Sequence, residues 1–234
     1  VVIIILPLSA VYHKIGEYGT PSYALSVTVS NNIAYVAAWD AGLQIIDISN
    51  PQNPSLLGSY DTPDYANYVV MSDNIVYVAG GESGLLIVDV TNPENPFLLS
   101  SYYTTGSAFS VDFYNSIAYV ANGWAGLQII DVSNPENPSL LGSYDTPDWA
   151  YSVFVSNNIA YVADGWAGLQ IIDVSNPQNP VLLVSYDTPR YAESVTVSNN
   201  IAYVADGWAG LQIIDVTNPQ NPFILGSYHT PYYA

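Results

Sequence analysis

One unit of 42 residues repeats five times along this chain of 234 residues, and that period limits what the chain can fold into. Glycine, tyrosine and paired prolines recur at fixed places in every copy, and no insertion breaks the period between residues 25 and 234. Aspartate keeps the same step, at Asp47, Asp89, Asp131, Asp173 and Asp215. A fixed period of this length is typical of solenoids, propellers and other repeat arrays.

Each copy carries four short β-rich runs separated by turn-forming residues. In the fourth copy these runs are 152–155, 159–163, 169–174 and 181–186. The second run is apolar on both faces, as expected of a sheet that is covered on both sides by neighbouring blades. Prolines and β-branched residues in every copy exclude a helical repeat. We therefore predict an all-β fold, a β-propeller of four-stranded antiparallel blades with a 42-residue repeat.

The period also predicts the boundaries of the blades and one detail of their turns. No helix longer than one turn is expected, and the aspartate that ends each third strand should accept backbone N–H groups in the turn that follows it. The propeller spans 25–234, with five complete blades at 25–66, 67–108, 109–150, 151–192 and 193–234.

Residues 1–24 depart from the repeat, and two interpretations of this leader stay open. Its first ten residues resemble the end of a signal-peptide apolar region, with Ser9 and Ala10 near a cleavage point. In the other interpretation they belong to a partial blade, and residues 11–24 pair as a strand beside a complete one. In that register Ile3 and Ile4 align with Ile45 and Ile46.

The second interpretation bears on ring closure. A leader that supplies the third and fourth strands of a blade leaves the first two to follow residue 234 in a longer parent protein, and we expect that parent to be six-bladed. Otherwise the chain closes on five blades or exposes an edge that recruits another chain.

The third strand of each copy carries a motif that identifies a family. Gly84-Leu85-Leu86-Ile87-Val88-Asp89, the four copies of Gly-Leu-Gln-Ile-Ile-Asp, and the Val/Ile-Ser/Thr-Asn-Pro that follows resemble the LVIVD repeat. The resemblance covers all five units. It implies a propeller of the kind found in bacterial and archaeal secreted or cell-surface proteins, and it brings no catalytic residues with it. The leader departs from the motif, because Ile5 stands where aspartate is expected.

Charge and composition exclude several classes of function. The chain has 20 acidic and 2 basic residues and a formal net charge of −18, which excludes nucleic-acid binding and disfavours anionic lipid surfaces. It has no cysteine, and a Ser/His pair would need His13 or His229. Neither a histidine pair for zinc nor a phosphate-binding loop is present. We predict no catalytic residues.

Strand direction predicts that two sets of loops share one face: the loop between the second and third strands, and the link that leaves the fourth strand. Aromatic rings there suit the apolar faces of sugars, and carboxylates accept hydroxyl groups or bind Ca²⁺. The candidate ligand-binding residues are Trp39, Asp40, Trp124, Asp145, Trp149, Asp164, Trp166, Asp187, Asp206 and Trp208.

The alternative for these residues is structural: each tryptophan packs across a joint between blades, and each aspartate caps its own turn. For Trp124, Trp166 and Trp208 we expect more than half of each ring to be buried, with the indole N–H bonded to a neighbouring loop.

These observations favour a non-catalytic, extracellular or cell-surface binding or interaction module. A protein or carbohydrate ligand is expected on the Asp/Trp face, with Ca²⁺ as a possible cofactor, or self-association through an open blade edge; nucleic acid and membrane insertion are not expected. One alternative is a structural or self-assembling surface domain. Another is a polysaccharide hydrolase whose two carboxylates assemble across blades.

Overall fold

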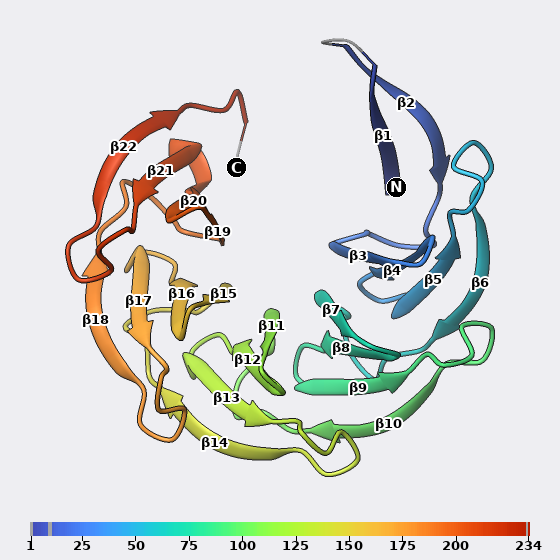
Figure 1. Cartoon of the computed structure of the whole chain (residues 1–234), viewed down its shortest axis with the longest axis horizontal. Helices are drawn as coiled ribbons and strands as arrows, with labels where there is room; N and C mark the ends of the chain where they lie inside the picture. Colours follow the sequence, from blue (N-terminus) through green and yellow to red (C-terminus); the bar gives the residue numbers. More distant parts are fainter. Residues whose placement is uncertain (1, 9–10, 233) are drawn as a thin grey trace. The chain divides into compact units, whose positions relative to one another are not determined.

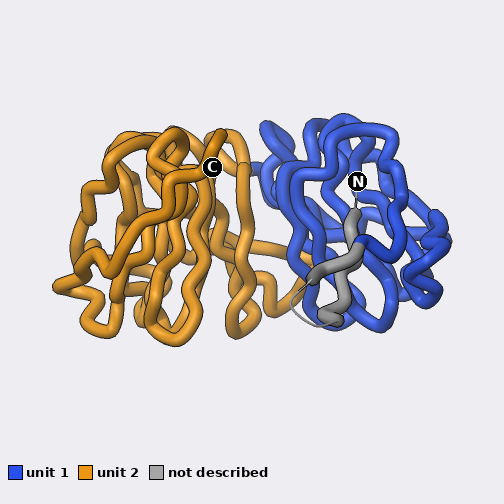
Figure 2. Tube along the Cα trace, turned by 90° about the horizontal axis from the view of Figure 1, so that it is seen from above, with its two compact units in different colours: residues 1–103 blue, residues 104–234 orange. Residues whose placement is uncertain are grey.

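A computed structural model gives the backbone of residues 2–8, 11–232 and 234, and the side chains of these residues from 14 onward. Within them the chain is built of short antiparallel strands, and the single helical segment is the 3₁₀ turn Gly207–Ala209. None of the described segments is a helix long and apolar enough to cross a membrane. The predicted fold class, all-β with four-stranded antiparallel sheets at a 42-residue spacing, is confirmed (Figure 1). The chain divides into two compact units, 1–103 and 104–234 (Figure 2).

The first unit contains a two-stranded sheet and two complete blades. The strands of the small sheet are β1 (Val2–Leu8) and β2 (Val11–Tyr18). Blade 1 consists of β3 (Ser26–Ser30), β4 (Ile33–Ala37), β5 (Leu43–Asp47) and β6 (Ser55–Tyr60), and blade 2 of β7 (Tyr68–Ser72), β8 (Ile75–Ala79), β9 (Leu85–Asp89) and β10 (Phe97–Tyr102).

The second unit contains three blades with the same strand order. Blade 3 consists of β11 (Ser110–Tyr114), β12 (Ile117–Ala121), β13 (Leu127–Asp131) and β14 (Ser139–Tyr144); blade 4 of β15 (Ser152–Ser156), β16 (Ile159–Ala163), β17 (Leu169–Asp173) and β18 (Val181–Tyr186); and blade 5 of β19 (Ser194–Ser198), β20 (Ile201–Ala205), β21 (Leu211–Asp215) and β22 (Phe223–Tyr228).

Two local sequence signals fix the turns of each blade. The first and second strands are joined by pairs such as Asn157-Asn158, whose φ angles of 52° and 62° are those of the type I′ hairpin turn. The predicted turn after the third strand is confirmed in all five blades, where the aspartate accepts the N–H of the residue two positions on at 2.7–2.9 Å: Asp47 from Ser49, Asp89 from Thr91, Asp131 from Ser133, Asp173 from Ser175 and Asp215 from Thr217.

The core lies at the joints between consecutive blades within each unit. Between blades 4 and 5 the second and third strands of blade 4 supply Tyr161, Ala163, Leu169 and Ile171. These side chains pack against the first three strands of blade 5, including Val195. Because one blade face meets the preceding blade and the other meets the next, the second strand is buried on both faces, as its sequence predicts.

The leader forms paired strands in the described residues, but its register differs from that of the repeat. Ile45 pairs with Gly58, so the repeat predicts Ile3 opposite Gly16; in the structure Ile3 lies opposite Glu17. The register suggested by sequence is therefore wrong by one residue. Residues 9 and 10, the proposed cleavage point, lie outside the described residues, and the signal-peptide interpretation stays a prediction.

Candidate functional site

The loop between the second and third strands and the link out of the fourth strand lie together, as the strand directions predict. In blade 4 the N–H of Gly165 donates to the carbonyl of Ala192 at 3.1 Å, and the N–H of Ala192 donates back at 2.9 Å. Gly165 has φ 52°, a left-handed conformation that glycine adopts without cost. The adjacent Trp166 consequently sits at an exposed loop tip beside the link that leaves blade 4.

The exposure of Trp124, Trp166 and Trp208 contradicts the prediction that more than half of each ring is buried. Trp124, Trp166 and Trp208 are 58%, 64% and 63% exposed, so more than half of each residue faces solvent. Trp149, in the link between blades 3 and 4, is 42% exposed. The left-handed glycine before each loop-tip tryptophan turns the chain away from the blade, which leaves the ring outside the joint.

Two of the predicted ligand-binding carboxylates are buried turn caps instead. Asp206 is fully buried, and its carboxylate accepts the Thr188 hydroxyl at 2.8 Å and the Arg190 N–H at 3.1 Å. Asp164 is also fully buried and accepts the N–H of Asp148 at 3.2 Å. Burial raises the pKa of both carboxyls, against hydrogen bonds that lower it. Asp164 and Asp206 hold the preceding link in place and are out of reach of a surface ligand.

Asn122 fills the same place in blade 3 without a charge. The nitrogen of its side-chain amide donates to the Thr104 hydroxyl at 2.8 Å. The oxygen of the same amide accepts the Gly106 N–H at 3.0 Å. An uncharged amide therefore makes the same clamp on a link as the aspartates of blades 4 and 5.

A second clamp runs in the opposite direction, from the link to the loop tip. The carboxylate of Asp148 accepts the N–H of Trp166 at 2.7 Å, and that of Asp64 accepts the N–H of Glu82 at 2.7 Å. A Cβ at Gly165 would lie 2.5 Å from the Asp148 carboxylate, so only glycine leaves room for this clamp. Asp148 thereby fixes the backbone that carries the exposed Trp166.

Five aromatic residues of the second unit form one continuous series of ring contacts, here called the aromatic strip: Phe109, Trp149, Tyr151, Trp166 and Tyr191. The ring centroids of Phe109 and Tyr151 are 5.1 Å apart, and both the Tyr151–Tyr191 and the Trp166–Tyr191 distances are 5.4 Å. Trp149 joins the strip at 6.0 Å from Phe109 and 6.2 Å from Tyr151. The strip crosses from the start of blade 3 to the link that enters blade 5.

The aromatic strip carries a polar edge. The Tyr191 hydroxyl donates to the Tyr151 hydroxyl at 2.8 Å. Burial, this hydrogen bond and the nearby carboxylates of Asp148 and Glu193 raise the pKa of Tyr151. Tyr151 therefore stays protonated at neutral pH, and the hydroxyls of the pair can exchange hydrogen bonds with a ligand's hydroxyl groups.

The first unit has a smaller aromatic group built around Trp39. Trp39 stacks on Tyr65 with a centroid distance of 4.5 Å and meets the edge of Tyr23 at 5.7 Å. Trp39 occupies the place of the left-handed glycines and itself has φ 49°, a conformation that is rare for a bulky residue. The remaining candidates Asp40, Asp145 and Asp187 are exposed and lie near the loops as predicted.

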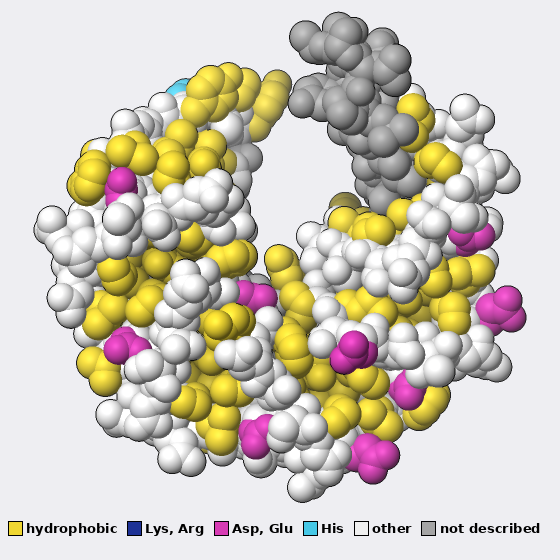
Figure 3. Space-filling model, viewed as in Figure 1, with side chains coloured by type: hydrophobic (Ala, Val, Ile, Leu, Met, Phe, Trp, Pro, Cys, Tyr) yellow, Lys and Arg dark blue, Asp and Glu magenta, His cyan; other side chains and the backbone are white. Residues whose placement is uncertain are grey.

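The acidic residues do not gather into a metal site. Among the described residues, no three His, Cys, Asp or Glu side chains lie close enough together to hold a metal ion. Asp112, which is unique to blade 3, accepts the N–H groups of Val155 at 2.6 Å and Phe113 at 2.8 Å and so ties β11 to β15. In the space-filling view the carboxylates lie singly among hydrophobic and neutral side chains (Figure 3).

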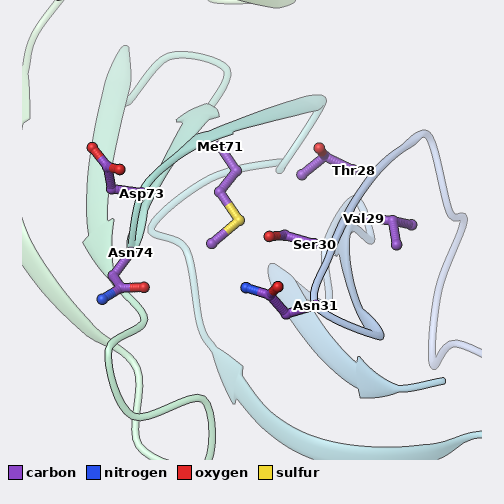
Figure 4. A pocket seen from close by; sticks show the side chains of 7 residues that line it. All are labelled: Thr28, Val29, Ser30, Asn31, Met71, Asp73 and Asn74. Atoms are coloured by element: carbon purple, nitrogen blue, oxygen red, sulfur yellow. The ribbon is translucent and has the colours of Figure 1, made fainter. Parts of the chain in front are cut away.

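Hollows between neighbouring blades lie near the type I′ turns, away from the tryptophan loops. In the first unit a hollow of about 510 Å³ is lined by Thr28, Ser30, Asn31 and other residues of the two turns, with Met71 at its centre (Figure 4). A hollow of about 620 Å³ recurs between blades 4 and 5. Amide and hydroxyl side chains line both hollows, and the carboxylate of Asp73 joins them in the first.

A comparison with protein-family models agrees with this architecture. The model of the LVIVD repeat matches five successive segments, at 21–62, 63–104, 105–146, 149–188 and 189–230. The chain belongs to the LVIVD repeat family. Each matched segment begins a few residues before the first strand of a blade and ends just after its fourth strand. Each match therefore contains the four strands of one blade. No curated protein matches the chain in sequence.

Solved structures with the same fold are distant in sequence. The computationally designed Ika8 protein is similar with a TM-score of 0.72 over 92% of this chain at 15% identity. The computationally designed Ika4 protein is similar with a TM-score of 0.57 over 68% of this chain, also at 15% identity. The chain spans 64% of the length of Ika8 and 96% of that of Ika4. At 15% identity, the similarity to these structures supports only the fold of the chain.

Sequence reasoning missed Phe109, Tyr151 and Tyr191, although a signal was present. Phe109 and Tyr151 are 42 residues apart, and so are Trp149 and Tyr191, so each pair occupies one place in consecutive repeats. Aromatic residues at two nearby places in neighbouring copies predict rings that meet across a joint.

Proposed function

We propose that this LVIVD protein is a non-catalytic binding module that takes a neutral carbohydrate on the aromatic strip. The observation that carries the proposal is the unbroken series of ring contacts that ends in solvent-exposed tryptophans, with Trp149 42% and Trp166 64% exposed. Flat rings present apolar faces on which the C–H faces of sugars stack, and the polar edge supplies partners for hydroxyl groups.

Charge supports a neutral ligand rather than an anionic one. The chain has a formal net charge of −18 and 2 basic residues, and Asp148 and Glu193 lie beside the strip. Anionic polysaccharides would meet like charge, which disfavours their approach and binding. Neutral glycans do not carry this cost.

Rigidity of the site supports binding as its role. Trp166 is anchored through its N–H to Asp148, and Asp148 is anchored through its own N–H to the buried Asp164. Side chains placed on a fixed backbone lose less conformational entropy when a ligand binds, so affinity is higher. The module is expected to act at the cell surface or outside the cell, where polysaccharides are exposed.

Titration against neutral polysaccharides and their oligosaccharides tests the proposal. A β-glucan, a mannan and a chitin oligosaccharide are titrated by calorimetry, with release of reducing ends measured in parallel. Saturable binding without turnover is expected, and Trp149→Ala and Trp166→Ala should each weaken it by about tenfold or more, as for aromatic residues central to an interface.

Trp124→Ala is the matched control, because Trp124 occupies the same loop position as Trp166, is 58% exposed and lies outside the aromatic strip. It should leave affinity unchanged. Binding of none of the neutral glycans, or an equal loss of affinity in Trp124→Ala, would contradict the proposal. Release of reducing ends would favour the hydrolase alternative.

A further inference from the structure

The first strand of blade 1 exposes valines whose counterparts in the other blades are buried or half-buried. Val27 is 49% exposed and Val29 is 58% exposed, whereas Val69, Val153 and Val195, which occupy the place of Val27 in their blades, are at most 5% exposed. Figure 4 shows Val29 pointing away from Met71, so this apolar face looks away from blade 2. We call it the open valine face; it comprises Val27 and Val29 of β3 together with the neighbouring Leu25, which is 51% exposed.

The repeat itself shows what covers such a face. Val69 is buried in a cluster with Tyr35 and Ala37 of the second strand, and with Leu43 and Ile45 of the third strand, of the preceding blade. In the second unit Val195 is buried in the same way by Tyr161, Ala163, Leu169 and Ile171. An open valine face therefore matches the second and third strands of a preceding blade.

The outer half of such a blade is already present beside blade 1. Tyr18 of β2 packs with Ala24 and Ile48 against buried Ala34, Val36 and Ile46, and 42 residues later Tyr60 joins the corresponding cluster of blade 2. A Cβ at Gly16 would lie 1.8 Å from the carbonyl oxygen of Pro51, and one at Gly58 would lie 2.4 Å from that of Pro93. β2 therefore takes the place of a fourth strand, and its partner β1 that of a third.

The inner edge of this half-blade is open in the described structure. The small sheet has the order β1–β2, and among the strands the structure describes β1 pairs with β2 alone. An unpaired strand edge next to an exposed apolar face is the arrangement that accepts an added strand, with backbone hydrogen bonds along the edge and side chains in the adjoining apolar surface.

We propose that β1 and the open valine face form a docking site for a β-hairpin with the first- and second-strand pattern of this repeat. Its second strand would pair with β1, and the tyrosine and alanine of that strand would cover Val27, as Tyr161 and Ala163 cover Val195. The occupant completes a four-stranded blade. This proposal rests on the first unit alone and is independent of glycan binding.

A suitable probe exists within the chain. Residues 193–206 contain β19, β20 and the turn Asn199-Asn200, whose φ angles of 51° and 60° are those of a type I′ turn. This turn favours a two-residue hairpin in an isolated peptide. Tyr203 and Ala205 of the peptide correspond to the residues expected to face Val27.

The test measures binding of the fluorescently labelled peptide 193–206 to the whole chain by anisotropy. Saturable binding is expected, together with slower amide exchange in β1. Val27→Asn should weaken binding by about tenfold or more, since it removes apolar surface that binding buries. Val181→Asn is the matched control, because Val181 is also a strand valine and is 51% exposed; it should have no effect. The peptide variant Tyr203→Asn should bind the natural chain no more tightly than the original peptide binds the Val27→Asn chain.

Three outcomes would overturn the proposal. They are the absence of saturable binding by both the linear peptide and a cyclised version, binding that Val27→Asn leaves unchanged, and a concentration-dependent dimer that Val27→Asn abolishes without any peptide binding. The last result would show that a second copy of the chain, rather than a hairpin, covers the open valine face.

Discussion

The Thr188 hydroxyl donates a hydrogen bond of 2.8 Å to the fully buried carboxylate of Asp206, and this contact joins the link that leaves blade 4 to the loop of blade 5. The Arg190 N–H reaches the same carboxylate at 3.1 Å. A buried charge thus holds a loop of the face that carries the aromatic strip, and burial raises the pKa of that carboxyl above its ordinary value of 3.8.

Replacing Asp206 by asparagine should remove a pH-dependent loss of stability. Since the folded pKa is raised, the folded state holds this proton more tightly than the unfolded state, and the resulting stability is lost as pH rises from about 4 through the folded pKa. Asn122 already makes the same clamp without charge. Asp206→Asn should therefore gain stability relative to the natural chain between pH 4 and pH 7, measured as the urea midpoint. A relative loss across that range would contradict the assignment.

Trp166→Ala should cost little stability. The residue is 64% exposed, and exposed substitutions usually change the free energy of unfolding by no more than about 0.5 kcal/mol. Ile171 of the third strand in the same blade is fully buried, and Ile171→Ala should cost about 2–5 kcal/mol. Denaturant unfolding of both variants checks the pair. Equal losses would restore the interpretation of Trp166 as a core residue.

At residue 39 the usual order of stability should be reversed, with glycine more stable than alanine. Trp39 has φ 49°, where four other blades have glycine, and a left-handed conformation costs an alanine roughly 1–2 kcal/mol. Both Trp39→Gly and Trp39→Ala lose the stacking on Tyr65, so that contribution cancels in the comparison. Thermal unfolding should place Trp39→Gly about 1 kcal/mol above Trp39→Ala. The opposite order would show that the loop relaxes when the ring is removed.

The repeat predicted the fold because one physical pattern recurs without interruption. Strands apolar on both faces, turn pairs such as Asn157-Asn158 and the aspartate that ends each third strand act locally, and each was readable from residues close in sequence. Asp173 illustrates this, since it accepts the N–H of Ser175, two residues on.

The candidate site was harder to predict because it depends on which way short loops turn. Trp166 and Asp164 are two residues apart, yet one is exposed and the other fully buried. Gly165 lies between them in a left-handed conformation and turns the chain, so the two side chains face different surroundings. Composition alone does not distinguish the exposed residue from the buried one. The register of the leader was missed for a related reason, since a slip of one residue keeps an apolar run apolar.

Indole N–H resonances of the ¹⁵N-labelled protein, followed while a neutral oligosaccharide is added, give the most direct test of the aromatic strip. The account predicts that the signals of Trp149 and Trp166 shift in a saturable way, while those of Trp39 and Trp124, which lie outside the strip, stay in place. Assignments come from single Trp→Phe variants. Unchanged signals for Trp149 and Trp166 with every neutral glycan, or equal shifts at Trp124, would contradict it.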